Sequence, residues 1–349
     1  MVTPVDPFVA TASGDTGLRV LFIGGTGVIS AGAARRAVAV GHELTMLNRG
    51  GQTPRPAPEG AEVLKADIRD PASVRAALGT RTFDVVVDFV AFTADHVAAD
   101  IELFSGRTGQ YVFISSASAY QKPPARLPIL ESTPLRNPFW QYSRDKIAGE
   151  DLLVRAYRDK GFPATIIRPS HTYDQTKIAL TGGWTDIARM RAGKPVVVHG
   201  DGTSLWTLTH SSDFAKAFVG LLGLPQAVGD SFTITSDEYL PWNEIYEIFA
   251  QAAGAPAPQL VHIASDTIAA AAPDIGPGLL GDKAHSVVFD NSKVKSLVPE
   301  FICTVPFAIG ARQVVGWFDS NPDQQRVDER LSATFDQLIA AAGGSSAAG

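Results

Sequence analysis

The sequence predicts an α/β protein with a doubly wound parallel sheet of the Rossmann type and a smaller mixed α/β lobe at its C-terminal end. Short apolar segments alternate with helical ones through the first half of the chain, as expected of parallel strands joined by crossover helices. A glycine-rich turn joins the first strand to the first helix. The chain has 349 residues, more than one core usually holds, so two lobes are expected.

The order of elements follows from the apolar pattern. Leu18–Gly24 is a short apolar strand, and the helical stretch that follows runs through Ala33–Val40 and ends at Gly41. A helix is expected to begin at Pro71 because proline suits the first turn. Further strands are expected at 43–47, 62–66, 84–90, 111–115 and 164–169, and further helices at 71–78, 95–104 and 139–160.

After Ser116 the pattern becomes less regular. Gln121–Pro138 contains five prolines, so we expect a long irregular loop of the kind that covers or builds a site. From Thr172 onward helices and short strands mix, which is typical of a second lobe that folds back on the sheet.

Composition excludes several classes of protein. Thirty basic and thirty-six acidic side chains give a net charge of −6 and no basic cluster occurs, so nucleic acid is not an expected partner. Cys303 is the single cysteine, and the seven histidines lack metal-type spacing, so neither a disulfide framework nor a metal site is expected. The chain has no apolar run long enough for a membrane helix and no signal peptide at its start, which predicts a cytoplasmic protein.

The glycine-rich turn predicts a pyrophosphate site. Small residues let the backbone approach the phosphates, and the N-terminus of the following helix supplies unpaired N–H groups with a partial positive charge. Ser30 stands where a third glycine is usual and is small enough to permit close packing. The residues expected to contact the dinucleotide here are Gly24, Gly25, Thr26, Gly27, Val28 and Ile29.

The end of the second strand bears on the choice between NAD and NADP. Asn48 takes the place of the acid that would bind the ribose 2′-hydroxyl, and Arg49 follows it with a guanidinium suited to a 2′-phosphate. We therefore favour NADP over NAD, with a solvated arginine as the alternative. Asp67 and Ile68 end the third strand, where they could hold the adenine edge; Asp67 could equally cap the helix that begins at Pro71.

Tyr142 and Lys146 are four residues apart, hence on one face of the predicted helix. A free tyrosine titrates near pH ~10, so a tyrosine that acts as a base needs a nearby positive charge, which Lys146 could provide. Ser115 and Ser116 follow a buried strand and could hold a substrate oxygen at the sheet edge where ligands bind.

These motifs together resemble the short-chain dehydrogenase/reductase superfamily, in its extended branch of NAD(P)-dependent epimerases and dehydratases. The resemblance covers about Leu18 to Trp317 and rests on the sequence Gly-Gly-Thr-Gly-Val-Ile, on 113–120 (Phe-Ile-Ser-Ser-Ala-Ser-Ala-Tyr), on Tyr142 with Lys146, and on 167–173 (Ile-Arg-Pro-Ser-His-Thr-Tyr). Weaker support comes from 209–213 and 289–293.

The resemblance implies roles for individual residues. Ser116, four residues before Tyr120, would be the active-site serine; Tyr142 would be the acid/base; Lys146 would hold the nicotinamide ribose and lower the pKa of the tyrosine. It also implies a homodimer formed through the helices at 95–104 and 139–160. The other implied cofactor contacts are Phe89, Val90 and Ala91 along its middle, Ser115 at the strand end, and Pro169 and His171 over the nicotinamide.

Departures from the family pattern concern the substrate. Ala117 and Ser118 stand where sugar-nucleotide 4,6-dehydratases carry an Asp-Glu pair, which disfavours dehydration. Trp206 stands where UDP-sugar 4-epimerases carry an arginine for the pyrophosphate, which favours a smaller or less anionic sugar or polyol as the substrate. Ser118, His171 and Trp206 are the candidate substrate contacts. The Asn-Arg-Gly ending at 48–50 also resembles an atypical subgroup with plastid RNA-associated members, although the acidic charge speaks against RNA.

The resulting prediction is an NAD(P)-dependent oxidoreductase or epimerase that transfers hydride at an alcohol or ketone carbon. The alternatives are a dinucleotide-binding sensor or scaffold without catalysis and, among enzymes, a sugar-nucleotide epimerase. The expected divisions are a flexible N-terminus at 1–17, a dinucleotide-binding domain at 18–170, a mainly substrate-binding lobe at 171–342 with segments returning to the core, and a flexible tail at 343–349.

Overall fold

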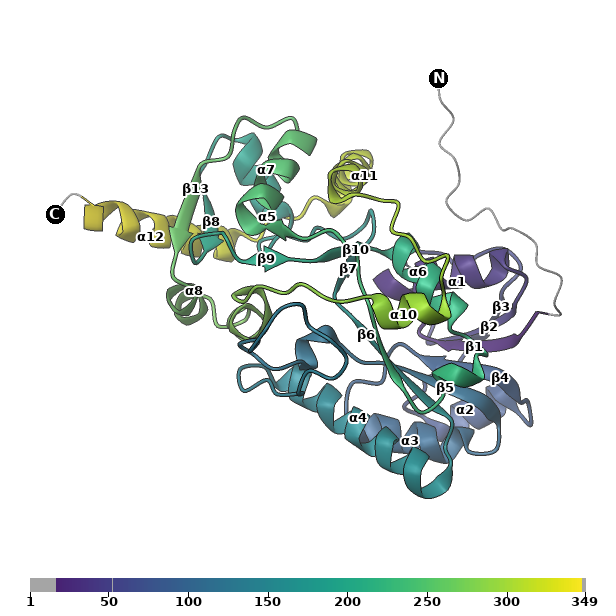
Figure 1. The fold of residues 1–349 in the computed structure, drawn as a ribbon. Coiled ribbons are helices and arrows are strands. Elements are labelled where there is room, and N and C mark those ends of the chain that lie inside the picture. The colour runs from purple at the N-terminus through teal and green to yellow at the C-terminus, as the bar shows by residue number, and fades with distance from the viewer. Residues whose placement is uncertain (1–16, 52, 347–349) are drawn as a thin grey trace.

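The main sheet has seven parallel strands in the order β11-β6-β5-β4-β1-β2-β3 (Figure 1). The computed structural model describes residues 17–51 and 53–346. The order of strands along the sheet reverses between β1 and β4, so the carboxyl ends of these two strands border the crevice where doubly wound folds bind ligands. The strands are Arg19–Ile23 (β1), Glu43–Asn48 (β2), Glu62–Lys65 (β3), Phe83–Asp88 (β4), Thr108–Ile114 (β5), Ala164–Pro169 (β6) and Ser231–Ile234 (β11).

Helices cover both faces of this sheet (Figure 1). One face buries a core with α1 and α6, and the other buries a second core with α2, α3 and α4. The valines of β4 point alternately into these two cores, which explains their nearly continuous run. The helices are Val28–Ala39 (α1), Pro71–Leu78 (α2), Ala94–Phe104 (α3), Gln141–Lys160 (α4) and Ser211–Gly220 (α6), with the short α10 (Ser292–Leu297) beside β11. The predicted fold class is confirmed.

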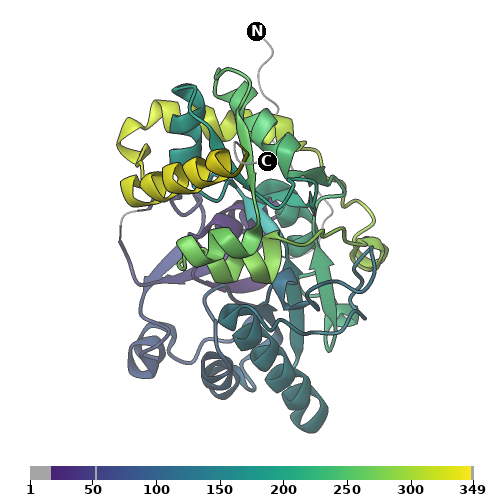
Figure 2. The same cartoon turned by 90° about the vertical axis from the view of Figure 1, so that its left-hand side faces the viewer.

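The C-terminal lobe has its own core, rich in aromatic side chains, above the carboxyl ends of the strands (Figures 1 and 2). Its elements include three two-stranded pairings, β10 with β7, β12 with β9 and β13 with β8. These strands are His171–Tyr173 (β7), Val196–His199 (β8), Leu205–Trp206 (β9), Leu208–His210 (β10), Leu240–Pro241 (β12) and Leu260–Ile263 (β13). The helices are Trp184–Arg191 (α5), Trp242–Ala252 (α7), Ser265–Ala271 (α8), Gly276–Gly278 (α9), Phe307–Ser320 (α11) and Glu329–Ser346 (α12).

Some element bounds differ from the sequence prediction. Helix α1 begins at Val28, well before Ala33, because Gly27 adopts the extended N-cap conformation and Ser30 closes the first turn. Strand β4 ends at Asp88, since the Asp88 side chain accepts backbone N–H groups of the next residues and turns the chain. Helix α12 continues through Ser346 into the predicted tail. The rest of that tail and residues 1–16 of the predicted N-terminus lie outside the described residues.

The lobe and the sheet share segments of chain. Strand β11 and helix α6 come from the C-terminal half, yet β11 pairs with β6 and α6 packs against α1. Gly32 of α1 lies so close to α6 that a Cβ there would come within 2.8 Å of the Ser211 carbonyl oxygen. Of the helices within 17–51 and 53–346, none is long and apolar enough to cross a bilayer.

Candidate active site

The glycine-rich loop between β1 and α1 forms one wall of a cavity of about 680 Å³. Ser30 holds the loop closed, because its Oγ accepts from the Gly27 N–H at 2.7 Å and donates to the Gly24 carbonyl at 2.8 Å. Gly24 has φ +80°, and a Cβ there would meet Val90 Cγ1 at 2.5 Å. Side chains would fill this cradle, whereas glycine leaves room for a pyrophosphate at the helix N-terminus.

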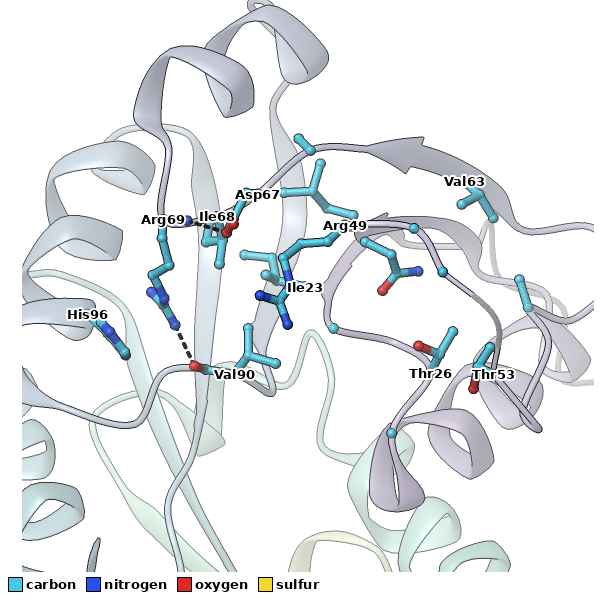
Figure 3. Close-up of a pocket in the computed structure, with 18 of the residues that line it drawn as sticks. Ile23, Thr26, Arg49, Thr53, Val63, Asp67, Ile68, Arg69, Val90 and His96 are labelled. Atoms are coloured by element: carbon cyan, nitrogen blue, oxygen red, sulfur yellow. Dashed lines mark hydrogen bonds between the residues drawn. The ribbon is translucent and has the colours of Figure 1, made fainter. Parts of the chain in front are cut away.

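The carboxyl end of β2 forms the second wall of the same cavity. Asn48, Arg49 and Gly50 line it, and Figure 3 shows Arg49 reaching into it. Lys65 is in register with Asn48 on the neighbouring strand, and its side chain lies over Gly50, with Nζ 3.7 Å from the position of a Cβ there. Two cations therefore flank the backbone that follows Asn48, and only Arg49 was predicted from the sequence.

The far end of the cavity is lined by the residues that follow β3. Asp67 and Ile68 lie there, and Asp67 Oδ1 accepts the N–H of Arg69 at 2.9 Å. The helix after it is capped by Asp70, so Asp67 is not that cap. Arg69 crosses the cavity and donates to the Val90 carbonyl, while His96 of α3 completes the wall (Figure 3).

Tyr142, Ser116 and Lys146 lie together near the carboxyl end of β5, with the Lys146 Nζ 5.7 Å from the centroid of the Tyr142 ring. Burial raises the pKa of Tyr142, and a hydrogen bond from the Ser116 hydroxyl acts in the opposite direction. Lys146 is 1% exposed and donates to the carbonyls of Ala91 at 2.6 Å and Ile114 at 2.7 Å. Burial lowers the pKa of Lys146 to about 8, and the Asp88 carboxylate opposes that shift. A phenol and a buried ammonium thus share one corner of the sheet edge.

The two serines predicted at the end of β5 have different surroundings. Ser116 Oγ lies 2.8 Å from Ser118 Oγ and lines a second cavity of about 260 Å³. Ser115 is 2% exposed and donates to Glu150, which forms a buried ion pair with Arg168 at 2.5 Å. Its hydroxyl therefore bonds to Glu150 within the protein and is not available to a substrate oxygen.

Tyr142 faces the second cavity, whose walls come from both halves of the chain. Ser118, Pro169, His171 and Trp206 line it. Ser118 Oγ also accepts from Ser143 at 2.8 Å, so its hydroxyl belongs to a hydrogen-bond network below the cavity. The other residues that line this cavity are Ile29, Ala117, Trp140, Ser170, Thr172, Asp282 and Lys283.

His171 is held in one tautomer by Trp206. The Trp206 Nε1–H donates to His171 Nδ1 at 3.1 Å. Burial, with Lys283 and Lys177 nearby, lowers the pKa of His171 to about 3, so the ring is neutral at physiological pH. Its proton is then on Nε2 and can be donated to a ligand. Trp206 itself is 1% exposed, so it acts on the cavity mainly through His171.

Asp282 and Lys283 bring two charges into the second cavity. Asp282 pairs with Lys122, a fully buried lysine, at 3.0 Å, and its presence raises the pKa of Tyr142. Burial lowers the pKa of Lys283, whose Nζ lies 6.0 Å from the centroid of the Trp206 ring. Sequence spacing gave no signal for this pair, because it lies more than one hundred residues after the tyrosine and reaches the cavity only through the fold.

The sheet order, the glycine cradle and the paired cavities define a nucleotide-binding α/β protein of the doubly wound class. Residues 20–234 match the model of the NAD dependent epimerase/dehydratase family. The chain belongs to this family, as its sequence motifs implied.

Two curated relatives illustrate the range of the family. The chain is 30% identical over 244 residues to 2′-dehydrokanamycin reductase of Streptomyces kanamyceticus, an alignment that covers 68% of each chain. It is 29% identical over 256 residues to the chloroplast stem-loop binding protein of 41 kDa b of Arabidopsis thaliana, covering 70% of this chain and 65% of that relative.

Solved structures agree on the fold. An epimerase of Methanothermobacter thermautotrophicus superposes with a TM-score of 0.73 at 17% identity, covering 89% of this chain and 95% of the other. UDP-glucose 4-epimerase of Bifidobacterium longum, solved with NAD⁺ and UDP, superposes with a TM-score of 0.68 at 19% identity, covering 88% and 99%. The described residues contain no cluster of three or more His, Cys, Asp or Glu side chains arranged to hold a metal ion.

Proposed function

We propose that this protein is an NAD(P)-dependent oxidoreductase or epimerase that transfers hydride at a secondary alcohol or ketone carbon of a sugar-like or polyol substrate. The observation that carries the proposal is that Tyr142 and Ser116 line a cavity formed by both halves of the chain, with the Lys146 Nζ 5.7 Å from the centroid of the Tyr142 ring. A bound nicotinamide would supply the hydride chemistry that no protein side chain offers.

The first cavity fits a dinucleotide. Gly24, Thr26 and Gly27 line it and would hold the pyrophosphate, and Asp67 and Ile68 would hold the adenine end. Gly25 and Val28 belong to the same turn, whereas Ile29 lines the second cavity. The loop Phe89–Ala91 would lie along the middle, and Pro169 and His171 would border the nicotinamide. Asn48 and Arg49 would face the adenosine ribose, where Lys65 adds a second cation. A 2′-phosphate dianion would pair with these two charges, so NADP is preferred to NAD.

In the reaction, Tyr142 Oη exchanges the proton of the substrate oxygen. The Ser116 hydroxyl orients that oxygen and also hydrogen-bonds to Tyr142, which favours the phenolate. The Lys146 ammonium favours the phenolate through its charge. His171 would donate its Nε2–H to a second substrate oxygen, and Lys283 would contact an oxygen-rich group further out.

A labelling experiment tests the proposal. Purified protein is incubated with NADPH or NADH carrying deuterium at C4 and with a panel of sugars, polyols and ketones. We expect deuterium at the new carbinol carbon for a reductase, or an epimer formed without net cofactor consumption. Tight dinucleotide binding without label transfer or epimer formation across the panel would favour the alternative, a dinucleotide-binding sensor or scaffold.

Two further features belong to the same proposal. Helices α3 and α4 pack side by side on one face of the sheet, and we propose that they form a homodimer interface, which light scattering would test. A sugar-nucleotide epimerase is the second candidate among enzymes, favoured by the UDP-glucose 4-epimerase of Lactobacillus helveticus, 29% identical over 43% of this chain and 51% of that relative. Trp206 in the arginine position argues against it.

A further inference from the structure

Two buried carboxyl side chains lie together at the start of the Phe89–Ala91 loop, which follows β4. Asp88 ends β4 and is 0% exposed, and Asp100 on α3 is 1% exposed. The two side chains are within hydrogen-bonding reach of each other. Neither belongs to the site residues of the proposed reaction.

The hydrogen bonds around this pair leave one acceptor without a donor. Asp88 Oδ1 accepts from the backbone N–H groups of Val90 and Ala91. Asp100 Oδ2 accepts from the Tyr111 hydroxyl at 2.6 Å. Asp88 Oδ2 is buried and, within the described part of the chain, has no hydrogen-bond donor. A buried acceptor without a donor is costly, and two ionised carboxylates in contact repel, so a proton between them resolves both problems.

The proton is better placed on Asp100 than on Asp88. Asp88 Oδ1 accepts two N–H groups, which stabilise its ionised form, whereas Asp100 accepts one phenol. Burial and the neighbouring Asp88 raise the pKa of Asp100 well above the ordinary value. Protonated Asp100 would donate to Asp88 Oδ2, and Asp88 would keep the single negative charge.

That charge is coupled to the ammonium of Lys146. Lys146 donates to the carbonyl of Ala91, whose N–H is held by Asp88, and its second acceptor is also a neutral carbonyl. Asp88 raises the pKa of Lys146 more than Glu150 does, and Glu150 is already paired with Arg168.

The other charged or titratable groups facing the pair come from several elements. Arg69, in the loop after β3, lowers the pKa of Asp100 and of Lys146. His96 of α3 interacts with Arg69, Asp88 and Lys146, and Tyr111 of β5 completes the set.

We propose that Asp88 and Asp100 share one proton, carried by Asp100, and that the remaining charge on Asp88 positions the Phe89–Ala91 loop and is the counter-charge that keeps Lys146 protonated. Asp88 and Asp100 are thus positioning residues that act through Lys146. The proton arrangement stands by itself, and its consequence for catalysis rests on the proposed function.

The test is a titration of Lys146 followed by NMR in the full-length protein with isotopically labelled lysine, with the signal assigned by its loss in Lys146→Arg. Asp88→Asn should lower the pKa of Lys146 by about one unit, a tenfold change in its acid dissociation constant, because the counter-charge is lost. Asp100→Asn should leave it near the wild-type value, since Asp88 stays charged and the new amide still donates to it. Asp95→Asn, exposed on the same helix, is the matched control and should change nothing.

An equal or larger fall of the Lys146 pKa in Asp100→Asn would overturn the assignment, as would an unchanged pKa in Asp88→Asn. If Asp88→Asn does not fold, infrared spectra in D₂O decide the question. Wild type should show the C=O band of a protonated carboxyl at pH 8, and Asp100→Asn should lack it. The spectra are recorded in an Asp186→Asn background, because burial raises the pKa of Asp186 to about 7. A band that persists in Asp100→Asn contradicts the proposal. These measurements need no substrate, so their failure is distinct from failure of the proposed function.

Discussion

The two cavities of the molecule differ in how the chain builds them. The larger one is lined by segments that immediately follow β1, β2, β3 and β4, so short local motifs form it. The smaller one combines Ser116 and Tyr142 with His171, Trp206 and Lys283, which come from distant parts of the sequence. A local motif can be recognised in the sequence, whereas a combination of distant side chains forms only in the folded chain. The difference explains why the class of cofactor can be inferred for this protein more readily than its substrate.

The largest expected effect comes from a change at Tyr142, which lines the smaller cavity, and it should alter turnover without altering cofactor affinity. Tyr142→Phe should reduce turnover roughly 10²–10⁴-fold, as for loss of an acid/base, while dinucleotide affinity stays near wild type. Tyr157→Phe, at an exposed position of the same helix, should leave both unchanged. The rate is measured on a substrate found by the labelling screen, and the affinity by fluorescence titration. Wild-type turnover in Tyr142→Phe would remove the assigned chemistry.

A change in the glycine cradle should affect the larger cavity alone. Gly24→Ala places a Cβ 2.5 Å from Val90 Cγ1 at φ +80°, so we expect dinucleotide affinity to fall by about tenfold or more. Gly316→Ala, in α11 with no atom within 4 Å of the added Cβ, is the matched control. Undiminished affinity in Gly24→Ala, measured by calorimetry, would mean that the cofactor lies elsewhere.

The pH dependence of stability tests whether the pKa of the buried Lys146 ammonium is lowered in the folded protein. The pKa of Lys146 in the folded protein is about 8, below the ordinary value near ~10.4, so the unfolded chain binds more protons between these pH values. Stability conferred by this group therefore rises with pH through that window. Relative to Lys146→Met, wild type should gain about 2 kcal/mol of unfolding free energy between pH 7 and pH 10.

Urea unfolding at the two pH values measures this difference. Lys160→Met, exposed at the end of the same helix, should show no such trend. A constant gap between wild type and Lys146→Met would argue against a depressed pKa.

The smaller cavity can be perturbed without the larger one. Lys283→Met removes an ammonium from the smaller cavity, so the Michaelis constant for substrate should rise by about tenfold as a charge-assisted hydrogen bond is lost. The affinity for NADPH should not change, because Lys283 lies outside the larger cavity. A weaker cofactor complex with an unchanged Michaelis constant would reverse the assignment of the two cavities.

The smallest effects concern the 2′-phosphate. Arg49→Ala and Lys65→Ala should each weaken NADPH several-fold and up to about tenfold, with little change for NADH, and the loss should shrink as salt is added. Arg81→Ala removes a cation that pairs with Glu62 at the other end of β3, and it should affect both cofactors equally little. Equal losses for NADPH and NADH in Arg49→Ala would exclude a 2′-phosphate contact.

The fold and the reacting groups could be predicted because both depend on local pattern. The glycine loop, the valine-rich strand before Asp88 and the four-residue spacing of Tyr142 and Lys146 each determine structure within one or two elements. The surroundings of Ser115 and Asp282 could not be predicted from local sequence pattern. Ser115 resembles an active-site serine in sequence, yet its hydroxyl is taken by Glu150, and Asp282 reaches the second cavity through a loop of the C-terminal lobe.

The central claim is that the chain binds a nicotinamide dinucleotide that serves its reaction. The most direct measurement is to denature the purified protein, identify any released dinucleotide by mass and absorbance, and titrate the cofactor-free protein with NADPH and NADH. We expect one dinucleotide bound per chain, with NADPH bound more tightly when the cofactor exchanges freely. A protein that releases no dinucleotide and binds neither form would contradict the claim.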